Sequence, residues 1–170
     1  MDEAVLRALA RWPNVPACHG WLSLDRRGRW RMQGEAVTHP GLADFIGRNY
    51  ACDDTGCWYT QNGPQKVFIT LAYTPWILRT TPTGFVTHTG AGFVPQAGWT
   101  DEEGNLLLSG PLGIGLVHDH DLGALADTVR LPEDDVPGRI ELPSGALSLV
   151  PIRAAEVPTR FGFTPSPQPA

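Results

Sequence analysis

Two stretches of this 170-residue chain repeat one another, and the repeat limits the fold more than any other feature. In each copy a Gly-Trp pair precedes an acidic turn, two glycines frame a short strand-like segment, and a histidine precedes an amphipathic run. The matched positions are Gly20 and Gly98, Trp21 and Trp99, Gly28 and Gly104, Gly34 and Gly110, and His39 and His120. The sequence therefore indicates a duplicated unit, with a short insertion in the second copy before His120.

Each copy has the pattern of a hairpin, a helix and a second hairpin. Asp25 to Gly28 and Asp101 to Gly104 combine an acid with a glycine, which is typical of tight turns between strands. Leu42, Phe45 and Ile46 form an apolar stripe at helical spacing in the first copy, so the helix is expected to lie on a sheet.

Two strand-like segments close the copies. The apolar run from Val67 to Tyr73 indicates a strand near the centre of the sheet. Its counterpart, from Ala146 to Ile152, contains Pro151, which lacks a backbone N–H and favours a strand edge or end.

The predicted fold class is α+β: two tandem repeats, each a β-hairpin, a short helix and a second β-hairpin, preceded by an N-terminal helix. Asp2 is expected to cap that first helix and Pro13 to end it. The expected divisions are an N-terminal helix and lead-in (1–19), the first repeat (20–79), a linker (80–97), the second repeat (98–163) and a disordered tail (164–170).

The run Gly28-Arg29-Trp30, followed by Gly34 and a short helix, resembles a family of small bacterial proteins of unknown function. The resemblance implies a fold of repeated α+β motifs and a role in signal transduction or small-ligand sensing. It implies no catalytic residues. The second copy has Asn105 and Leu106 where the first has Arg29 and Trp30, so any ligand contact by that arginine would belong to the first copy alone.

Composition narrows the classes of partner. The net charge is −5 and Lys66 is the single lysine, so the broad basic face that nucleic acid requires is not expected. No basic leader and no run of about 20 apolar residues is visible, and the cysteine count is odd, which together predict a cytoplasmic protein without a membrane partner. The expected partner is a small molecule or a protein, and the oligomeric state is left open.

The segment His118-Asp119-His120 allows two interpretations. Both imidazoles of a His-x-His pair project to one side of an extended chain, and Asp119 would add an oxygen ligand for a divalent metal. Alternatively the segment begins a helix, with Asp121 as the cap and His120 in the structural role that His39 has in the first copy. No cofactor is expected, except a divalent metal on the first interpretation.

A second candidate site is the basic turn, where Arg29 and Arg31 are candidates for binding an anionic ligand. Trp58 and Trp76 are candidates for lining a groove, whereas Trp21 and Trp99 are expected in the core. No convincing catalytic set is present, which favours a non-enzymatic module, signalling or regulatory, that binds a small molecule or a protein. The alternatives are a metal-binding protein or metal-dependent hydrolase centred on His118 and His120, and a structural or assembly component.

Overall fold

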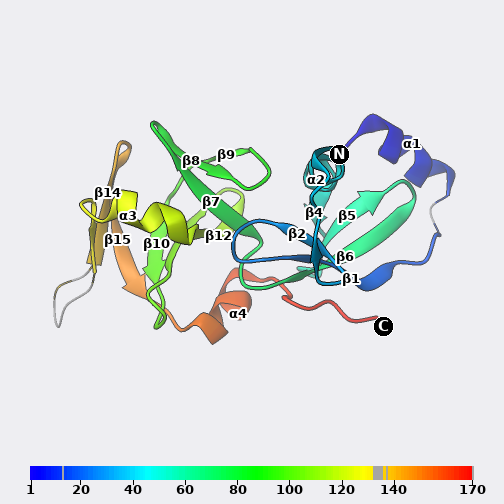
Figure 1. Ribbon diagram of the computed structural model, residues 1–170. Coiled ribbons are helices and arrows are strands. Elements are labelled where there is room, and N and C mark those ends of the chain that lie inside the picture. Colours follow the sequence, from blue (N-terminus) through cyan, green and yellow to red (C-terminus); the bar gives the residue numbers. More distant parts are fainter. Residues whose placement is uncertain (13, 132–135, 137, 170) are drawn as a thin grey trace. The chain divides into compact units, whose positions relative to one another are not determined.

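The structure is a computed structural model that describes residues 1–12, 14–131, 136 and 138–169 (Figure 1). The chain forms two compact units. Unit 1 contains Met1–Asp25, Arg29–Tyr73 and the C-terminal residues from Gly162 onward, and unit 2 contains Arg26–Gly28 and Thr74–Phe161. Pro13, expected to end the first helix, and Ala170, the last residue of the expected tail, lie outside the described residues.

Unit 1 is a six-stranded sheet with two helices, α1 (Glu3–Arg11) and α2 (Pro40–Arg48). The strand order is β3-β2-β1-β6-β5-β4, and the central pair β1 and β6 is parallel. The strands are β1 (Cys18–Leu24), β2 (Trp30–Met32), β3 (Glu35–Ala36), β4 (Tyr50–Cys52), β5 (Trp58–Asn62) and β6 (Gln65–Leu71). The apolar run predicted near the centre of the sheet is β6, between β1 and β5.

Unit 2 is a nine-stranded sheet in the order β13-β14-β15-β10-β11-β12-β7-β8-β9. Its strands are β7 (Trp76–Thr81), β8 (Gly84–Thr87), β9 (Gly92–Phe93), β10 (Ala97–Thr100), β11 (Leu106–Gly110), β12 (Gly113–Val117), β13 (Val129–Arg130), β14 (Gly138–Leu142) and β15 (Gly145–Pro151). The helices are η1 (Asp119–Asp121), α3 (Leu122–Leu125), η2 (Ala154–Glu156) and α4 (Val157–Phe161). Pro151 is the last residue of β15, which agrees with the expectation of a strand end.

The α+β fold with two tandem repeats is confirmed by the strand order. Unit 1 reads β3-β2-β1-β6-β5-β4, and the corresponding part of unit 2 reads β12-β11-β10-β15-β14-β13, with the central pair parallel in both. In each copy the helix follows the third strand. The register of the central parallel pair also matches: Leu22 of β1 pairs with Ile69 of β6, and Gly98 of β10 pairs with Leu149 of β15 at the equivalent position.

The segment expected as a linker, 80–97, contains β8 and β9, and β7 before it pairs in parallel with β12. Its prolines and glycines are typical of turns, but Phe85 is buried as a strand residue. Threonine and phenylalanine both favour strands, which explains why a turn-rich composition forms a hairpin here.

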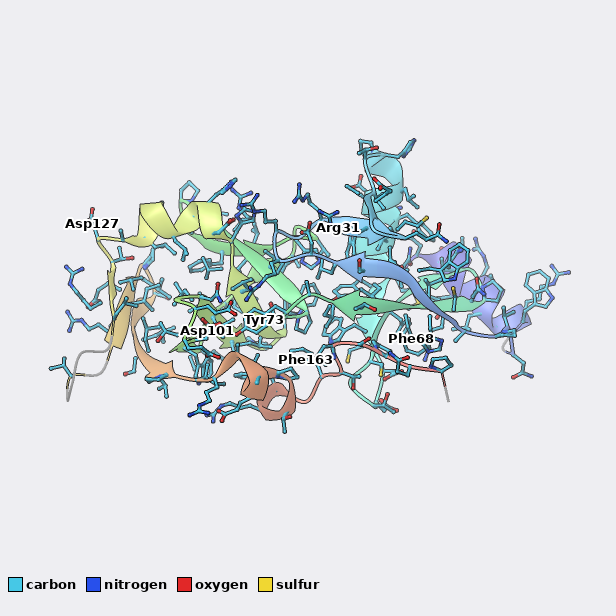
Figure 2. The ribbon with its side chains drawn as sticks, turned by 60° about the horizontal axis from the view of Figure 1, so that its bottom comes forward. Arg31, Phe68, Tyr73, Asp101, Asp127 and Phe163 are labelled. Carbon is cyan, nitrogen blue, oxygen red and sulfur yellow. The ribbon has the colours of Figure 1, made fainter. Side chains whose placement is uncertain are left out.

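The tail residues also differ from expectation. The N–H of Leu71 donates to the Pro165 carbonyl at 2.7 Å, and the N–H of Thr164 donates to the Gly56 carbonyl at 2.9 Å. Phe163, expected as the last residue of the second repeat, directly precedes this tail and is buried (Figure 2). The segment 162–169 is thus part of unit 1 and supplies one of its core side chains.

Two local expectations need correction. Asp2 is at the N-terminus of α1, but its carboxylate makes no cap hydrogen bond and pairs with Arg48 at 3.2 Å instead. Trp21 was expected in the core like Trp99, yet it is 53% exposed while Trp99 is 8% exposed. Asp25 and Asp101 begin equivalent turns. Trp99 is two residues before Asp101, so its equivalent in the first copy is Ser23, two residues before Asp25, and not Trp21.

No helix within the described ranges combines the length and the apolar character that a membrane-spanning segment needs.

Candidate functional site

Unit 1 contains a mainly apolar pocket of about 220 Å³ between α2 and the sheet. The helix contributes the stripe predicted from the sequence, Leu42, Phe45 and Ile46, and β1 contributes Leu22. Leu22 and Ile46 are buried and form the floor. Trp21, Met32 and Leu42 are exposed large apolar side chains at the rim. An apolar concavity with an exposed apolar rim is the usual form of a small-molecule site.

A bulge in β1 brings Trp21 to this pocket. Cys18 pairs with Val67 and Leu22 pairs with Ile69, so between these pairs three residues of β1 are opposite one of β6. Gly20 lies within the irregular stretch and has a φ of +74°, a conformation that favours glycine. Such bulges re-aim side chains beside functional sites. In an unbroken strand Trp21 and Leu22 would point to opposite faces, whereas here both line the pocket.

The pocket has an uncharged lining. Besides the apolar residues it contains Cys18, Thr60, Asn62 and Gln65. The Thr60 hydroxyl donates to the Ile46 carbonyl at 3.3 Å, and the Gln65 amide donates to the Pro16 carbonyl at 3.1 Å. Polar atoms of the lining are therefore partly satisfied by the protein, and no ionic partner is offered to a ligand.

The second repeat has different side chains at two of the pocket positions. Gly98 occupies the position of Leu22, and a Cβ added there would meet the Leu149 side chain at 2.6 Å. Ile140 occupies the position of Thr60 and is fully buried, as is Leu108. The Leu149 and Ile140 side chains thus take up space at the two positions that Leu22 and Thr60 occupy in the first copy.

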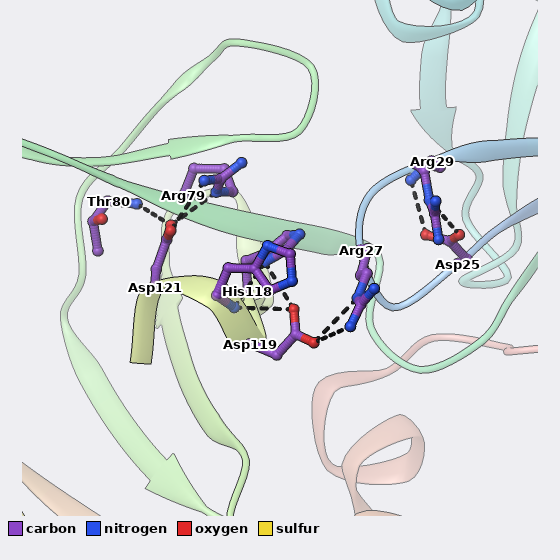
Figure 3. Close-up of polar contacts among 9 residues, drawn as sticks. Asp25, Arg27, Arg29, Arg79, Thr80, His118, Asp119 and Asp121 are labelled. Carbon is purple, nitrogen blue, oxygen red and sulfur yellow. Dashed lines mark hydrogen bonds and ion pairs between the residues drawn. The ribbon is translucent and has the colours of Figure 1, made fainter. Parts of the chain in front are cut away.

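Unit 2 brings the predicted histidine segment together with two arginines (Figure 3). His118, rather than Asp121, is the cap of η1: its Nδ1 accepts a hydrogen bond from the His120 N–H at 3.1 Å. The Asp121 carboxylate instead accepts from the Arg79 guanidinium at 2.8 Å and from the Thr80 N–H at 2.8 Å. The prediction that Asp121 caps the helix is therefore wrong.

The repeat explains why His118 is at this position. In the first copy His39 caps α2, with its Nδ1 accepting from the Leu42 N–H at 3.3 Å. The structural counterpart of His39 is thus His118, and not His120 as the sequence match indicated. The β11–β12 hairpin is longer than the β2–β3 hairpin, because Gly110 pairs before its turn whereas Gly34 lies within one. In addition, η1 separates His118 from α3, so the apolar run of the helix follows His120 in the sequence.

The two arginines beside the histidine segment each pair with a carboxylate. Arg27 Nη2 is 2.7 Å from Asp119 Oδ2, and the hydrogen bond from Arg27 lowers the pKa of that carboxyl group. The hydrogen bond from Arg79 lowers the pKa of Asp121 in the same way. Burial and the nearby Arg79 lower the pKa of His118, which keeps its imidazole neutral and leaves Nδ1 able to accept.

The other predicted site residues have structural contacts. Arg29 and Arg31 both pair with Asp25, at 3.0 and 3.2 Å, and Arg31 also donates to the Gly34 carbonyl at 3.0 Å. Trp58 and Trp76 are buried, in unit 1 and unit 2 respectively. Trp76 donates from its indole nitrogen to the Leu112 carbonyl at 2.6 Å. Arg29, Arg31 and Trp58 belong to unit 1, and Trp76 belongs to unit 2.

Sequence reasoning missed the pocket, although it found the α2 stripe. One signal was present: a glycine inside a strand-like segment marks a bulge, and Gly20 directly precedes Trp21. The pocket itself depends on side-chain volumes contributed by four strands and a helix, a sum that local patterns do not reveal.

The fold defines an α+β protein of two tandem repeats. The family model described as "Protein of unknown function (DUF2946)" matches residues 1–168, so the chain belongs to that family. None of the proteins with a curated description matches the chain significantly.

Two solved structures are similar. A DUF1285 family protein from Silicibacter pomeroyi DSS-3 has a TM-score of 0.57 and 18% identity, covering 83% of this chain and 85% of that one. A DUF1285 family protein from Shewanella baltica OS155 has a TM-score of 0.43 and 13% identity, covering 63% of this chain and 91% of that one. The first likeness shows a shared fold. Neither protein's description supports the link to signal transduction that the sequence resemblance implied.

Proposed function

We propose that this protein is a non-enzymatic binding module whose first repeat binds a small, uncharged, largely apolar molecule in the pocket between α2 and the sheet. The observation that carries the proposal is the asymmetry of the repeats: Leu22 and Thr60 line an apolar pocket in the first copy, whereas Gly98, covered by the Leu149 side chain, and the fully buried Ile140 occupy their positions in the second.

The size of the pocket favours a small molecule over a protein. A volume of about 220 Å³ is near the lower end for ligand sites, and a dry cavity of about 150 Å³ already accommodates benzene. A helix or strand of a partner would need a longer groove. A ring-sized molecule fits, and Trp21 at the rim offers an aromatic surface for it.

The lining also favours binding over catalysis. Cys18 and Thr60 are its nucleophilic side chains, and the lining contains no histidine or carboxylate that would activate either of them. The absence of a charged side chain among the lining residues means that a buried ionic group would have no partner, so an uncharged ligand is favoured.

The proposal is tested with indole as the probe, titrated into isotopically labelled protein and followed by amide chemical shifts. Indole is expected to bind with a Kd of about 1 mM or tighter and to shift amides of β1, α2, β5 and β6. Indole-2-carboxylate, which keeps the ring and adds a charge, is expected to bind at least about tenfold more weakly.

A pair of tryptophan variants provides the control. Trp21→Ala removes the aromatic side chain of the rim and is expected to weaken indole binding at least about fivefold. Trp12→Ala removes a tryptophan of nearly equal exposure, 51% against 53%, that does not line the pocket, and is expected to leave binding unchanged. Equal effects of the two variants, or shifts confined to unit 2, would refute the assignment.

A further inference from the structure

The cluster formed by His118, Asp119 and His120 in unit 2 is separate from the proposed pocket and has ligand atoms that all lie within 4.8 Å of one another. We propose that it binds one divalent ion of the copper(II) or nickel(II) class through two imidazole nitrogens and one carboxylate oxygen. This inference does not depend on the proposed function of the first repeat.

The first two ligand atoms already point to a common position. His118 Nδ1 and Asp119 Oδ1 are 2.9 Å apart, and both accept a hydrogen bond from the same backbone N–H, that of His120, at 3.1 and 3.0 Å. Both lone pairs are directed at that N–H, so an ion held by these two atoms would displace it as their partner, and η1 would lose its cap hydrogen bond. Two ligands about 2.1 Å from one ion and at a right angle to each other lie about 3 Å apart, so this spacing fits a tetragonal ion.

The third ligand is free to join them. The His120 ring is exposed, and its centroid is 5.0 Å from that of His118. Its nitrogens make no hydrogen bond within the part of the chain that the structure describes. The Asp119 side chain is half exposed, so water can complete the coordination. The bound ion would be exchangeable and not a closed structural metal.

The paired charges around the cluster permit a cation, and the ligand set favours one class of metal ion. Arg27 and Arg79 would repel a cation if they were unpaired, but each pairs with a carboxylate, on Asp119 and Asp121 respectively. Arg27 occupies Asp119 Oδ2 and leaves Oδ1 directed toward His118, which is how an outer partner orients a ligating carboxylate. A single carboxylate is too few for calcium or magnesium, whereas nitrogen ligands suit late transition metals.

The duplication supplies a matched control. His39 caps α2 as His118 caps η1, but it is followed by Pro40 and Gly41, which offer neither a carboxylate nor an imidazole. Asparagine is a good cap residue, so His118→Asn and His39→Asn each preserve a cap acceptor while removing an imidazole. His120→Ala removes the exposed third ligand.

The experiment titrates copper(II) into protein without a histidine tag, with calorimetry for stoichiometry and electron paramagnetic resonance for the ligand set. The wild type and His39→Asn are expected to bind one copper per chain with coupling to two nitrogens. His118→Asn and His120→Ala are expected to bind at least about tenfold more weakly, each losing one coupled nitrogen, with unchanged circular dichroism. A hundredfold excess of magnesium is expected not to compete.

Three results would overturn the proposal. The first is copper binding that is unchanged in both His118→Asn and His120→Ala. The second is an equal loss in His39→Asn. The third is a stoichiometry well above one with no defined nitrogen coupling, which would identify adventitious surface binding.

Discussion

Histidine has two structural uses in this chain that its usual roles do not suggest. His39 and His118 both act as helix caps through a neutral Nδ1, a task for which Ser, Thr, Asp and Asn are the common choices. The imidazole of His88 also accepts a hydrogen bond from a backbone group, the Ile77 N–H, at 3.3 Å. The backbone N–H of His88 in turn donates to the Ile77 carbonyl at 2.7 Å. In all three the imidazole accepts at Nδ1, so protonation there would remove a structural hydrogen bond.

The pH dependence of stability follows from His88. Burial lowers the pKa of this imidazole to about 3, below the value of about 6.5 in an unfolded chain. As pH falls below 6.5 the unfolded state gains a proton that the folded state does not. Stability present above pH 6.5 is thus lost toward pH 3, by about 2 kcal/mol between pH 7 and pH 5 from this residue.

Urea unfolding at pH 7 and pH 5 tests this, with His88→Asn as the variant. Asparagine retains an acceptor for the Ile77 N–H but does not titrate, so most of the loss at pH 5 is expected to disappear. A smaller loss should remain, because the pKa of His118 is lowered in the same direction by burial and by Arg79. An unchanged pH dependence in His88→Asn would show that His88 is not the main contributor.

At the scale of elements, three Asp-x-x-Gly turns organise the hairpins. Asp25, Asp53 and Asp101 each accept backbone N–H bonds through their carboxylates, for example from Asn105 to Asp101 at 2.9 Å. The glycine that follows has a φ of +76°, +78° or +79°. These turns use the side chain to replace a backbone acceptor and the glycine to reverse the chain.

Two of these glycines are expected to differ sharply on substitution. An alanine Cβ at Gly104 has no heavy atom within 4 Å, so Gly104→Ala is expected to cost only the left-handed backbone strain, about 1 kcal/mol. At Gly56 the Cβ would lie 2.4 Å from the Gly162 carbonyl oxygen, so Gly56→Ala should cost at least about 2 kcal/mol more. Urea unfolding of the two variants measures the difference, and equal costs would contradict the packing described for Gly56.

These turns also mark how far the sequence could predict the structure. The acidic turns and the α2 stripe identify the duplication, the order of elements and the helix faces, because each depends on residues close in sequence. The match of Trp21 with Trp99 was wrong by two residues. The turns that begin at Asp25 and Asp101 are the equivalent positions, and the two Gly-Trp pairs are not equivalent to each other. The pocket and the arginine pairs of the histidine cluster depend on long-range contacts, which one sequence does not specify.

At the scale of the whole molecule, the two copies have kept one topology and diverged in content. The first has the apolar pocket and the nine-residue α2, and the second has Gly98 and Ile140 in place of Leu22 and Thr60, a four-residue α3 and the His-Asp-His segment. Such divergence is expected after duplication, since the fold constrains core positions while loops and helix starts are free to vary. We therefore place each proposed site in the copy where it has no counterpart.

The C-terminal segment crosses from one unit to the other within two residues, which predicts opposite effects for two neighbouring phenylalanines. Phe161, in unit 2, packs edge-on against Trp99 with ring centroids 5.0 Å apart. Phe163, in unit 1, is 7% exposed and precedes the Pro165 carbonyl that accepts from Leu71. Phe163→Ala is expected to destabilise unit 1 by about 3 kcal/mol, and Phe161→Ala to affect unit 2.

Native-state hydrogen exchange distinguishes the two effects. In Phe163→Ala the amides of β1 and β6 should lose protection while those of β10 and β15 keep it, and in Phe161→Ala the pattern should reverse. Uniform loss across both sheets in either variant would show that the repeats unfold as one cooperative body. The predicted reversal would instead mean that the chain's last residues close the first repeat, so that unit 1 acquires its complete core only after unit 2 has been synthesised.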